Sequence, residues 1–563
     1  MNAVRQGRNA AAAAVSPLLL FLAFPNPLFE RGLPFFTVFG LFPLFYLLLN
    51  AGKSCYFWVP VAGVFTYLFV HFWLYTFNPL AMIFVCTVMG IAYLLFAVYV
   101  SVVRRCFGEN AYLPAAAGFT VFEYLKTVGF LAFPYGISGY SQYSVPGMRD
   151  IASVFGVFGV SFCLIFPAAF FAAVAGMPGR AEAAAFIYRQ RRRLTAFVLL
   201  FSFMIIAGTV HTSTIKPLSG KMPSEDCPAS VRILAVQHSG DTWTGGLPAY
   251  RRNYEILKHL TDRALAENET AGRAPYDMVI WPETAFVPGI EWHSRYNTSY
   301  ESKELTEQFL AWAETVPGIL ITGNSESCLA DPQKPPVVYD ADGNGFLNRY
   351  SYNAAVVLER GHIKGTYRKR HLVPVVEDFP WKETFPGIVR FLEAHGCQLW
   401  TPGEEAVLFK SISGVPFSVN ICYEDVFSEI ARQDVRNGSR LMINLTNDSW
   451  SGTNAAQMQH LAIAVFRSLE TGIPTVRATN SGITAVILPN GTVAAEADPL
   501  VKTVLSADVP LYAPAPAANA FVLRDTFPIL LAVLSAAALV FQILRIRKFS
   551  AESRRNGKLV KKR

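Results

Sequence analysis

Two apolar patterns divide the chain. Up to about residue 212, and again near the C-terminus, apolar residues form long segments separated by short polar loops. A hydrocarbon core about 30 Å thick needs roughly 20 apolar residues in a helix that crosses it. Segments of about this length run over residues 10–29, 33–49, 56–77, 80–103, 113–132, 151–176, 194–212 and 527–544. The pattern therefore predicts eight transmembrane helices, seven before residue 212 and one after residue 524.

The first of these segments has a second interpretation, as a cleaved signal peptide. It carries Pro17, Pro25 and Pro27 and is followed by the letters ERG, but no small-residue cleavage site follows its apolar run. We therefore expect it to remain as the first transmembrane helix.

Between residues 213 and 524 the apolar runs are shorter and alternate with helical stretches. Runs typical of buried strands cover residues 231–239, 276–284, 318–325, 354–360, 415–423, 440–448 and 482–491. Helical stretches lie at residues 249–267, 302–316 and 455–472. The pattern predicts a membrane domain over residues 1–212, an α/β domain over residues 213–524, and an eighth transmembrane helix with a basic tail over residues 525–563.

Composition supports a membrane location, and the charges orient the chain. Apolar residues make up 52% of the chain and charged residues 16%, compared with about 25% charged in an average soluble protein. The net charge is +8, and its basic clusters, such as residues 189–194 and 545–563, flank apolar segments, so we expect no nucleic-acid partner. Because basic loops face the cytoplasm, both termini are predicted to be cytoplasmic. Residues 213–524 would then lie in the periplasm of a bacterium with two membranes.

The cysteines show no metal or redox motif. They lie at positions 55, 86, 106, 163, 227, 328, 397 and 422. None belongs to a CxxC pair and no Cys/His spacing suggests zinc, so neither a metal nor another cofactor is expected. Pairing among Cys227, Cys328 and Cys397 is left open.

Two charges lie inside the fifth predicted span. Glu123 and Lys126 are one helical turn apart. Both a structural ion pair and a functional intramembrane pair fit this spacing.

Three predicted strands end beside residues with reactive side chains. Glu283 lies in VIWPETAF, Lys369 in GTYRKRHLVP and Cys422 in VNICYEDVF. Each alone has an ordinary interpretation: a solvated glutamate, a surface lysine and a core cysteine. Together they provide what acyl transfer through a thioester requires, because a thiol needs a base and a tetrahedral intermediate needs a cation and a backbone N–H. Glu283 is the candidate base, Cys422 the nucleophile, and Lys369 with the amide of Tyr423 the candidate oxyanion site.

The order and flanks of these residues resemble the nitrilase superfamily of carbon–nitrogen hydrolases. With the transmembrane segments included, the chain resembles the apolipoprotein N-acyltransferase family. The stretches that carry the resemblance are FPYGISGYSQ at 133–142, WPET at 281–284, YRKRHLVPVVE at 367–377, ICYED at 421–425, NDSWSGTNAAQMQH at 447–460 and VRATNSGITAVI at 476–487. The resemblance implies a polytopic helical membrane bundle that carries a nitrilase-like αββα sandwich. It also implies Glu283 as base, Lys369 as oxyanion stabiliser and Cys422 as nucleophile.

Further roles follow only from the resemblance. Glu377 matches a second glutamate of the lysine motif, and Tyr423 and Glu424 match supporting positions after the nucleophile. Trp243 matches a substrate-contacting tryptophan, with a shorter intervening spacing than the family pattern. Asn447 and Asp448, past the strand that follows Cys422, are expected to shape the wall of the pocket. Trp450 matches the tryptophan of the family's N-D-x-W-F-G stretch and is a further candidate for a supporting or binding role.

The sequence departs from the family pattern at two positions. Val376 stands where the family has glycine before the second glutamate, and Ser451 stands where it has phenylalanine after the tryptophan. Both changes affect the expected shape of the acyl groove, and neither touches the predicted triad.

The resemblance implies a two-step acyl transfer. A phospholipid acyl chain passes to Cys422 as a thioester, and then to the free α-amino group of the diacylglyceryl-modified N-terminal cysteine of an apolipoprotein, the last step of bacterial lipoprotein maturation. The expected partners are the phospholipid donor, the apolipoprotein acceptor and membrane lipid, and the expected state is a monomer. The alternative is a membrane-tethered amidase that uses water as acceptor, although one span would suffice for a tether. A transporter would require broken helices in an internal repeat, and the sequence shows no such repeat.

Two further assignments concern the surroundings of the site. Residues 376–400 mix aromatic and charged side chains, as expected of either a lid toward lipid or a packed surface loop. A Cys/His mechanism would need His371 or His460, but Glu283 already explains activation of the thiol. His371 is therefore expected to be a structural hydrogen-bonding residue.

Overall fold

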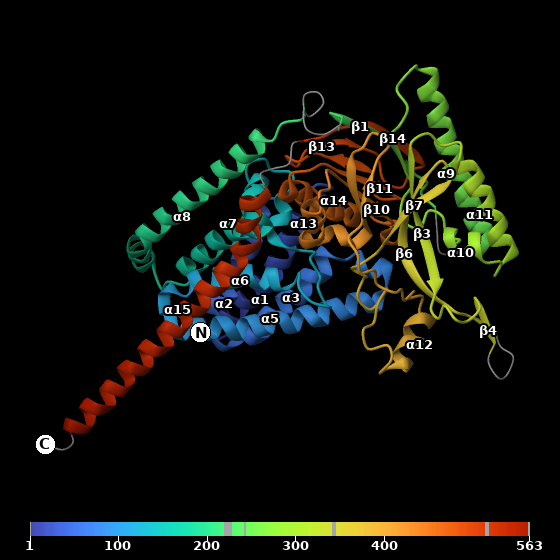
Figure 1. The fold of residues 1–563 in the computed structure, drawn as a ribbon. Helices are drawn as coiled ribbons and strands as arrows, with labels where there is room; N and C mark the ends of the chain where they lie inside the picture. The colour runs from blue at the N-terminus through green and yellow to red at the C-terminus, as the bar shows by residue number, and fades with distance from the viewer. Residues whose placement is uncertain (1, 219–227, 241–243, 340–344, 513–516, 561–563) are drawn as a thin grey trace. The chain divides into compact units, whose positions relative to one another are not determined.

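The chain forms two compact units in the computed structural model, which describes residues 2–218, 228–240, 244–339, 345–512 and 517–560 (Figure 1). The first unit comprises Met1–Thr212 and Ala518–Arg563, and the second comprises Ser213–Ala517.

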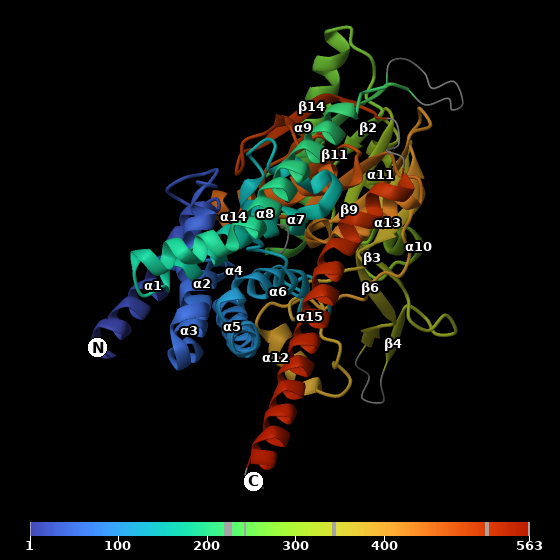
Figure 2. The same ribbon diagram turned by 90° about the vertical axis from the view of Figure 1, so that its left-hand side faces the viewer.

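The first unit is entirely helical in its regular structure. Its α-helices are α1 (Asn2–Ala23), α2 (Phe36–Asn50), α3 (Cys55–Val70), α4 (Leu74–Phe77), α5 (Pro79–Phe107), α6 (Tyr112–Leu125), α7 (Ala152–Ala175), α8 (Arg180–Thr214) and α15 (Ala517–Val560). Short 3₁₀ turns lie between them at η1 (Gly52–Ser54), η2 (Gly108–Asn110), η3 (Ser138–Gln142) and η4 (Arg149–Ile151). Figure 2 shows the same helices in a second view. Each predicted transmembrane segment overlaps one of these helices.

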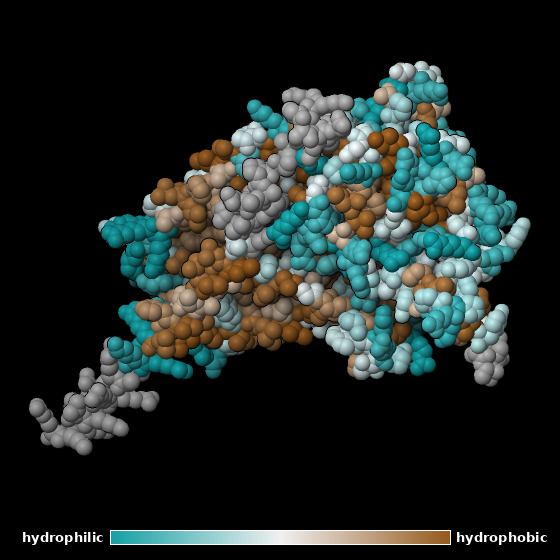
Figure 3. All heavy atoms as spheres, viewed as in Figure 1, coloured by the Kyte–Doolittle hydropathy of each residue, from teal (hydrophilic) through white to brown (hydrophobic). Residues whose placement is uncertain are grey.

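Some of these helices are long and apolar enough to cross a membrane. By length and composition, five helical stretches within the described residues are long and apolar enough to cross a membrane: Gly52–Val70, Pro79–Asn110, Arg149–Ala175, Arg180–Thr214 and Thr526–Lys548. The helix α2 is apolar but shorter. Figure 3 shows hydrophobic side chains gathered on the outer surface of these helices. Ile83 and Leu95 of α5 and Leu199 of α8 are each more than 60% exposed, as lipid-facing residues would be. The predicted total of eight spans stays a prediction.

The charges predicted inside the fifth span bind a loop of the same unit. One carboxylate oxygen of Glu123 accepts hydrogen bonds from the backbone N of Ser138 at 2.9 Å and from its hydroxyl at 2.6 Å. The Lys126 ammonium donates to the carbonyl of Gly136 at 3.5 Å. Both side chains therefore hold the loop that carries the GYSQ stretch.

The second unit contains two six-stranded mixed sheets. The first has the order β14-β1-β2-β3-β6-β7 and the second the order β13-β12-β11-β10-β9-β8. The strands of the first sheet are β1 (Ser230–Gln237), β2 (Met278–Ile280), β3 (Ile319–Leu329), β6 (Arg349–Glu359), β7 (His362–Arg368) and β14 (Thr503–Pro510). The strands of the second are β8 (Leu408–Lys410), β9 (Pro416–Ile421), β10 (Leu441–Thr446), β11 (Thr475–Thr479), β12 (Ala485–Ile487) and β13 (Val493–Glu496). A separate hairpin pairs β4 (Val337–Tyr339) with β5 (Gly345–Leu347). Within the sheets, β1, β2 and β3 run parallel, as do β9, β10 and β11.

The two sheets share one core, and helices cover their other faces. Side chains such as Ile280 and Ile321 of the first sheet pack in one cluster with Ile421 and Ile443 of the second. Another cluster joins the opposite face of the first sheet to α9 (Gly246–Thr270) and α11 (Tyr300–Ala313), and a small one joins β10 to α13 (Ser428–Arg436). The remaining helices of this unit are α10 (Ile290–Arg295), α12 (Pro386–Ala394) and α14 (Asn454–Thr471), and its 3₁₀ turns are η5 (Cys422–Val426) and η6 (Ser449–Ser451). Burial on both faces explains why the central strands are nearly continuous apolar runs.

Candidate active site

The three predicted reactive residues lie together just beyond strand ends of the two sheets. Glu283 follows β2, Lys369 follows β7 directly, and Cys422 follows β9 directly. The Lys369 Nζ lies 3.6 Å from Glu283 Oε1. The Cys422 thiol donates a hydrogen bond to Glu283, and its pKa responds to the charges of both Glu283 and Lys369. The three side chains therefore share one site.

Glu283 is a buried carboxylate held on both oxygens. Its Oε1 accepts a hydrogen bond from Asn353 Nδ2, and its Oε2 accepts one from the backbone N of Asn447, each at 2.8 Å. Burial raises the pKa of Glu283, while Lys369 and the hydrogen bonds from Asn353 and from the Cys422 thiol act in the opposite direction. A carboxylate with a raised pKa beside a thiol is suited to receive its proton.

Gly323 allows the turn that carries Glu283 to approach β3. The backbone N of Gly323 donates to the carbonyl of Pro282 at 3.1 Å. A Cβ at position 323 would lie 2.3 Å from the Thr284 N and 2.6 Å from the Cα of Glu283. Because no side chain fits there, glycine at 323 is a condition for the position of Glu283.

Lys369 is buried between two carboxylates. Its Nζ lies 2.9 Å from Oε1 and 2.8 Å from Oε2 of Glu377, in addition to its contact with Glu283. Burial alone would lower the pKa of Lys369, but Glu377 and Glu283 outweigh it and raise the pKa above its ordinary value. The lysine therefore stays charged, as a cation that stabilises an oxyanion must.

Cys422 adopts an unusual backbone conformation at the end of β9. Its φ is +51°, in the left-handed region that non-glycine residues rarely occupy, and such strain is frequent at functional sites. Burial and the charge of Glu283 raise the pKa of Cys422, and Lys369 lowers it. The thiol is therefore protonated at rest, and its activation requires transfer of the proton to a base.

Glu424 fastens the turn of the nucleophile to the segment of the lysine. Its Oε2 accepts from the Ile421 N at 2.8 Å, and its Oε1 accepts from the backbone N of Arg370 at 2.7 Å and of His371 at 3.1 Å. The Tyr367 hydroxyl lies 2.8 Å from both oxygens. Glu424 thus positions Cys422 relative to Lys369, while the ring of Tyr423 packs edge-on against Phe427.

A second buried charge cluster lies behind the nucleophile turn. The two ring nitrogens of His460 meet Asp425 at 2.7 Å and Asp448 at 3.0 Å, and Arg477 pairs with Asp425. Burial alone would lower the pKa of His460, but the two aspartates raise it to about 9. His460 therefore carries a charge, and since both its nitrogens are occupied by these aspartates it is a poor candidate for a base of Cys422.

The other predicted site residues differ in whether they contact Glu283, Lys369 or Cys422. Asn447 contributes its backbone N to Glu283, and its side chain accepts from Asn480 at 3.1 Å. Trp450 is partly exposed in η6. The imidazole of His371 lies 3.3 Å from Glu429, away from the reactive groups. Trp243 lies outside the described residues.

Asn353 is a site residue that the sequence analysis missed. It lies in β6, directly before the apolar run 354–360, and its amide reaches both Glu283 at 2.8 Å and Glu377 at 3.5 Å. An asparagine at the edge of a buried apolar run was the available signal, since buried polar groups need partners. Among the described residues, no group of three or more His, Cys, Asp or Glu side chains is placed to hold a metal ion.

The segment 376–400 contains the helix α12 and exposed apolar side chains. Trp381, Phe385, Ile388 and Phe391 are each 43–53% exposed, whereas Trp400 at the end of the segment is buried. Ile388 and Phe391 lie in α12, whereas Trp381 and Phe385 lie in the turn before it. Exposed apolar groups gathered in one segment are typical of a surface that meets lipid or another apolar partner.

Comparison with known proteins assigns the chain to a family. Residues 247–516 match the family model "Carbon-nitrogen hydrolase", and residues 16–170 match the model "Apolipoprotein N-acyltransferase N-terminal domain". Apolipoprotein N-acyltransferase 1 of Treponema denticola is 32% identical over 556 residues, which are 97% of this chain and 98% of that protein. The chain belongs to the apolipoprotein N-acyltransferase family.

Other members of the apolipoprotein N-acyltransferase family are also similar to this chain over most of its length. Apolipoprotein N-acyltransferase 1 of Treponema pallidum is 35% identical over 88% of each chain, and the enzyme of Borreliella burgdorferi is 28% identical over 84% of each chain. The resemblance inferred from the motifs is thereby confirmed, together with the nitrilase-type second unit and the membrane helices. The roles of individual residues in this acyltransferase stay predictions.

Proposed function

We propose that the chain transfers an acyl chain from a membrane phospholipid to the α-amino group of a diacylglyceryl-modified cysteine at the N-terminus of apolipoproteins. N-acylation of lipoproteins is the activity that family membership assigns to it. The observation that carries the residue assignment is the juxtaposition of Glu283, Lys369 and the Cys422 thiol in one buried site.

In the first step, Cys422 takes the acyl group. Glu283 accepts the thiol proton, and the sulfur attacks the ester carbonyl of the phospholipid. The oxyanion that forms is stabilised by Lys369 and the backbone N–H of Tyr423. When the C–O bond breaks, the lysophospholipid oxygen takes the proton from Glu283 and leaves a thioester on Cys422.

In the second step, the amine of the acceptor replaces the thiol. The free α-amino group attacks the thioester carbonyl, the C–S bond breaks, and the amine proton returns through Glu283 to the sulfur. The product is an amide and the resting thiol. Because water would hydrolyse the thioester, the site must exclude it, and the apolar side chains of residues 376–400 are candidates for this role.

The finer architecture is part of the same proposal. We infer eight transmembrane helices, a four-layer αββα sandwich on the periplasmic side of the bacterial inner membrane, and both termini in the cytoplasm. The distribution of basic residues supports this orientation. A monomer suffices for the proposed chemistry, because Glu283, Lys369 and Cys422 come from one chain.

Trapping of the acyl-enzyme tests the proposal. Protein in detergent is mixed with phospholipid labelled in one acyl chain, without acceptor, and then treated with neutral hydroxylamine. We expect label on the wild type and on Cys397→Ala, a matched control at another partly buried cysteine of the same unit, and none on Cys422→Ala. Label that hydroxylamine removes identifies the thioester.

Two outcomes would contradict parts of the proposal. Folded wild-type protein that takes no label would exclude the phospholipid-donor step and favour the tethered amidase. A labelled enzyme that releases free fatty acid in the presence of an acceptor peptide, without forming an amide, would show that water is the acceptor.

A further inference from the structure

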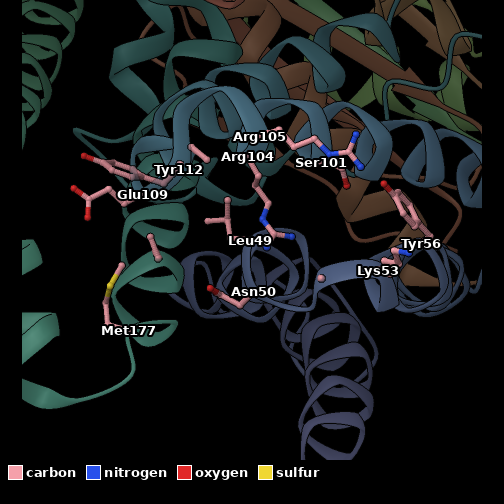
Figure 4. Close-up of a pocket in the computed structure, with 14 residues that line it drawn as sticks. Leu49, Asn50, Lys53, Tyr56, Ser101, Arg104, Arg105, Glu109, Tyr112 and Met177 are labelled. Atoms are coloured by element: carbon pink, nitrogen blue, oxygen red, sulfur yellow. The ribbon is translucent and has the colours of Figure 1, made fainter. Parts of the chain in front are cut away.

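A pocket lined by cations lies at one end of the helical unit, and the proposed acyl transfer does not use it. Its volume is about 450 Å³, and it lies where α2, α5 and α7 end and where α3 and α6 begin (Figure 4). At about 30 Å³ per water molecule, this space is far larger than a trapped water requires. Lys53, Arg104 and Arg105 line the pocket, with Ser101 and Tyr56 beside them.

These three cations have no anionic partner in the part of the chain that the structure describes. Among the described residues, no carboxylate lies within 4.0 Å of the Lys53, Arg104 or Arg105 side chains, and no hydrogen bond occupies them. Glu109, an acidic residue of the lining, is engaged by Arg189 at 2.7 Å. Figure 4 shows the guanidinium of Arg104 pointing into the pocket from α5. The pocket therefore presents uncompensated positive charge.

Helix dipoles explain only part of this arrangement. Arg104 and Arg105 lie in the last turn of α5, where the negative end of the helix favours cations. Lys53 lies in η1, directly before α3 begins at Cys55, and the positive end of a helix disfavours a cation there. An anion between Lys53 and Arg104 would be stabilised by both side chains and by the start of α3.

The surroundings favour an anion that carries acyl chains. Leu49, Ala173 and Met177 line the same pocket. On the outer surface nearby, Phe57 of α3 is 62% exposed and Val98 and Val102 of α5 are 46% and 38% exposed. A phosphate in the pocket would thus have apolar helix surface beside it. Basic pockets between transmembrane helices are suited to phospholipid headgroups.

We propose that this pocket binds the phosphate of an anionic phospholipid, with Lys53 and Arg104 as its principal contacts. Arg5 and Arg8 near the N-terminus and the basic residues 189–193 lie toward the same end of the helices. Under the positive-inside orientation, the lipid comes from the cytoplasmic leaflet. The pocket is then a structural or regulatory lipid site in addition to the acyl-transfer site.

Lipid titration followed by native mass spectrometry tests this site. The full chain in neutral detergent is titrated with dioleoyl phosphatidylglycerol, and in parallel with zwitterionic dioleoyl phosphatidylethanolamine. The pocket variant Lys53→Gln/Arg104→Gln is compared with Arg8→Gln/Arg192→Gln, which removes two charges from the same end of the unit but none from the pocket lining. We expect the pocket variant to lose roughly tenfold in affinity for phosphatidylglycerol, with a loss below about twofold in the control.

Each other outcome would overturn the proposal. Equal losses in both variants would mean that phosphatidylglycerol is held by overall surface charge. Displacement of phosphatidylglycerol by an equal concentration of inorganic phosphate would assign the pocket to a soluble anion. If the double variant does not fold, Lys53→Gln alone serves, because its exposed side chain has no contact to lose. An unchanged affinity for phosphatidylglycerol in folded Lys53→Gln would also exclude the assignment.

Discussion

Two buried charge clusters flank the nucleophile, and they differ in how well their charges balance. The first combines the carboxylates of Glu283 and Glu377 with the single cation of Lys369. The second combines Asp425 and Asp448 with two cations, His460 and Arg477. One cluster is left with an excess negative charge, and the other is neutral.

This difference supports the roles proposed for the two clusters, a reactive site for the first and a rigid support for the second. In the first cluster, burial and the charge of Glu377 raise the pKa of Glu283, which makes its carboxylate a better proton acceptor. In the second cluster each carboxylate has a cation, and His460 and Arg477 outweigh burial and lower the pKa of Asp425. The incomplete compensation of charge beside a thiol, which the second cluster lacks, is thus the feature that supports the proposed catalytic role of the first cluster.

The largest effect is expected when the base of the first cluster is neutralised. Glu283→Gln removes the proton acceptor and should slow acyl-enzyme formation by about 10³-fold, because general-base catalysis contributes roughly 10²–10⁴. The burst of labelled acyl-enzyme measures this rate. Glu359→Gln, at a partly exposed glutamate paired with Lys364, is the matched control and should leave the rate unchanged. A normal burst in Glu283→Gln would remove Glu283 from the mechanism.

Removing one of the two cations of the second cluster should instead cost stability. His460→Gln leaves Asp425 and Asp448 with Arg477 alone, and breaking a buried pair in this way costs about 3–5 kcal/mol. Chemical denaturation or a thermal shift in detergent measures the loss. His371→Gln, at a partly exposed histidine beside Glu429, should change stability by less than about 0.5 kcal/mol. If His460→Gln kept its stability but lost acyl-enzyme formation, the second cluster would be part of the chemistry.

Stability should also depend on pH through the second cluster. The folded pKa of His460, about 9, lies above its ordinary value of 6.5, so the folded state binds the proton more tightly than the unfolded state. The contribution is complete below about pH 6.5, and is lost as the pH rises through 9. It amounts to about 3 kcal/mol. The free energy of unfolding measured from pH 6 to 9.5 should fall in the wild type, and should fall less in His460→Gln. Parallel curves for the two proteins would contradict the charged state of His460.

The smallest expected effect is a change in the pKa of Glu283 when its hydrogen bond from Asn353 is removed. Asn353→Ala removes a hydrogen bond that lowers the pKa of Glu283, so that pKa should rise further. Because the base acts only when deprotonated, the acidic limb of the pH–rate profile should move to higher pH. The profile of acyl-enzyme formation measures this shift. Asn420→Ala, which removes a hydrogen bond to Asp434, is a control at a buried asparagine that does not contact Glu283, and its limb should stay in place.

The sequence predicted those parts of the site that follow strand ends. Glu283 and Cys422 were found because apolar runs stop beside them, and the carboxyl ends of strands gather functional groups. Lys369 was found from its basic, proline-closed stretch, because the strand before it, β7, is not an apolar run. The strand β14 was missed because its side chains alternate between partly buried and exposed and include Asp508, as an edge strand allows. The strand β11, TVRAT, was missed because Arg477 interrupts it, and the pairing of that arginine with Asp425 and Asp448 makes it compatible with burial.

Contacts between residues far apart in the chain could not be predicted from the sequence pattern. The network of Glu424 joins the nucleophile turn to residues more than 50 positions earlier, and no local periodicity records such a partnership. The fifth predicted span was too long, because the helix α6 ends at Leu125 and Gly129 adopts a positive φ in the turn that follows. The predicted end at residue 132 followed from the apolar composition of the segment, whereas the helix ends at Leu125, before the turn that contains Gly129.

The missing side chain at Gly323 has a consequence for how the site would appear in a genetic survey. Position 323 lies in the middle of β3 and carries no group that takes part in the chemistry, yet any Cβ there would displace the main chain under Glu283. Substitutions at 323 should therefore be recovered among inactivating alleles as often as those at the reactive residues. The positions that do not tolerate substitution would therefore include more than the residues proposed to contact the acyl group. They would also include positions, such as 323, where the backbone of the site packs closely against another strand.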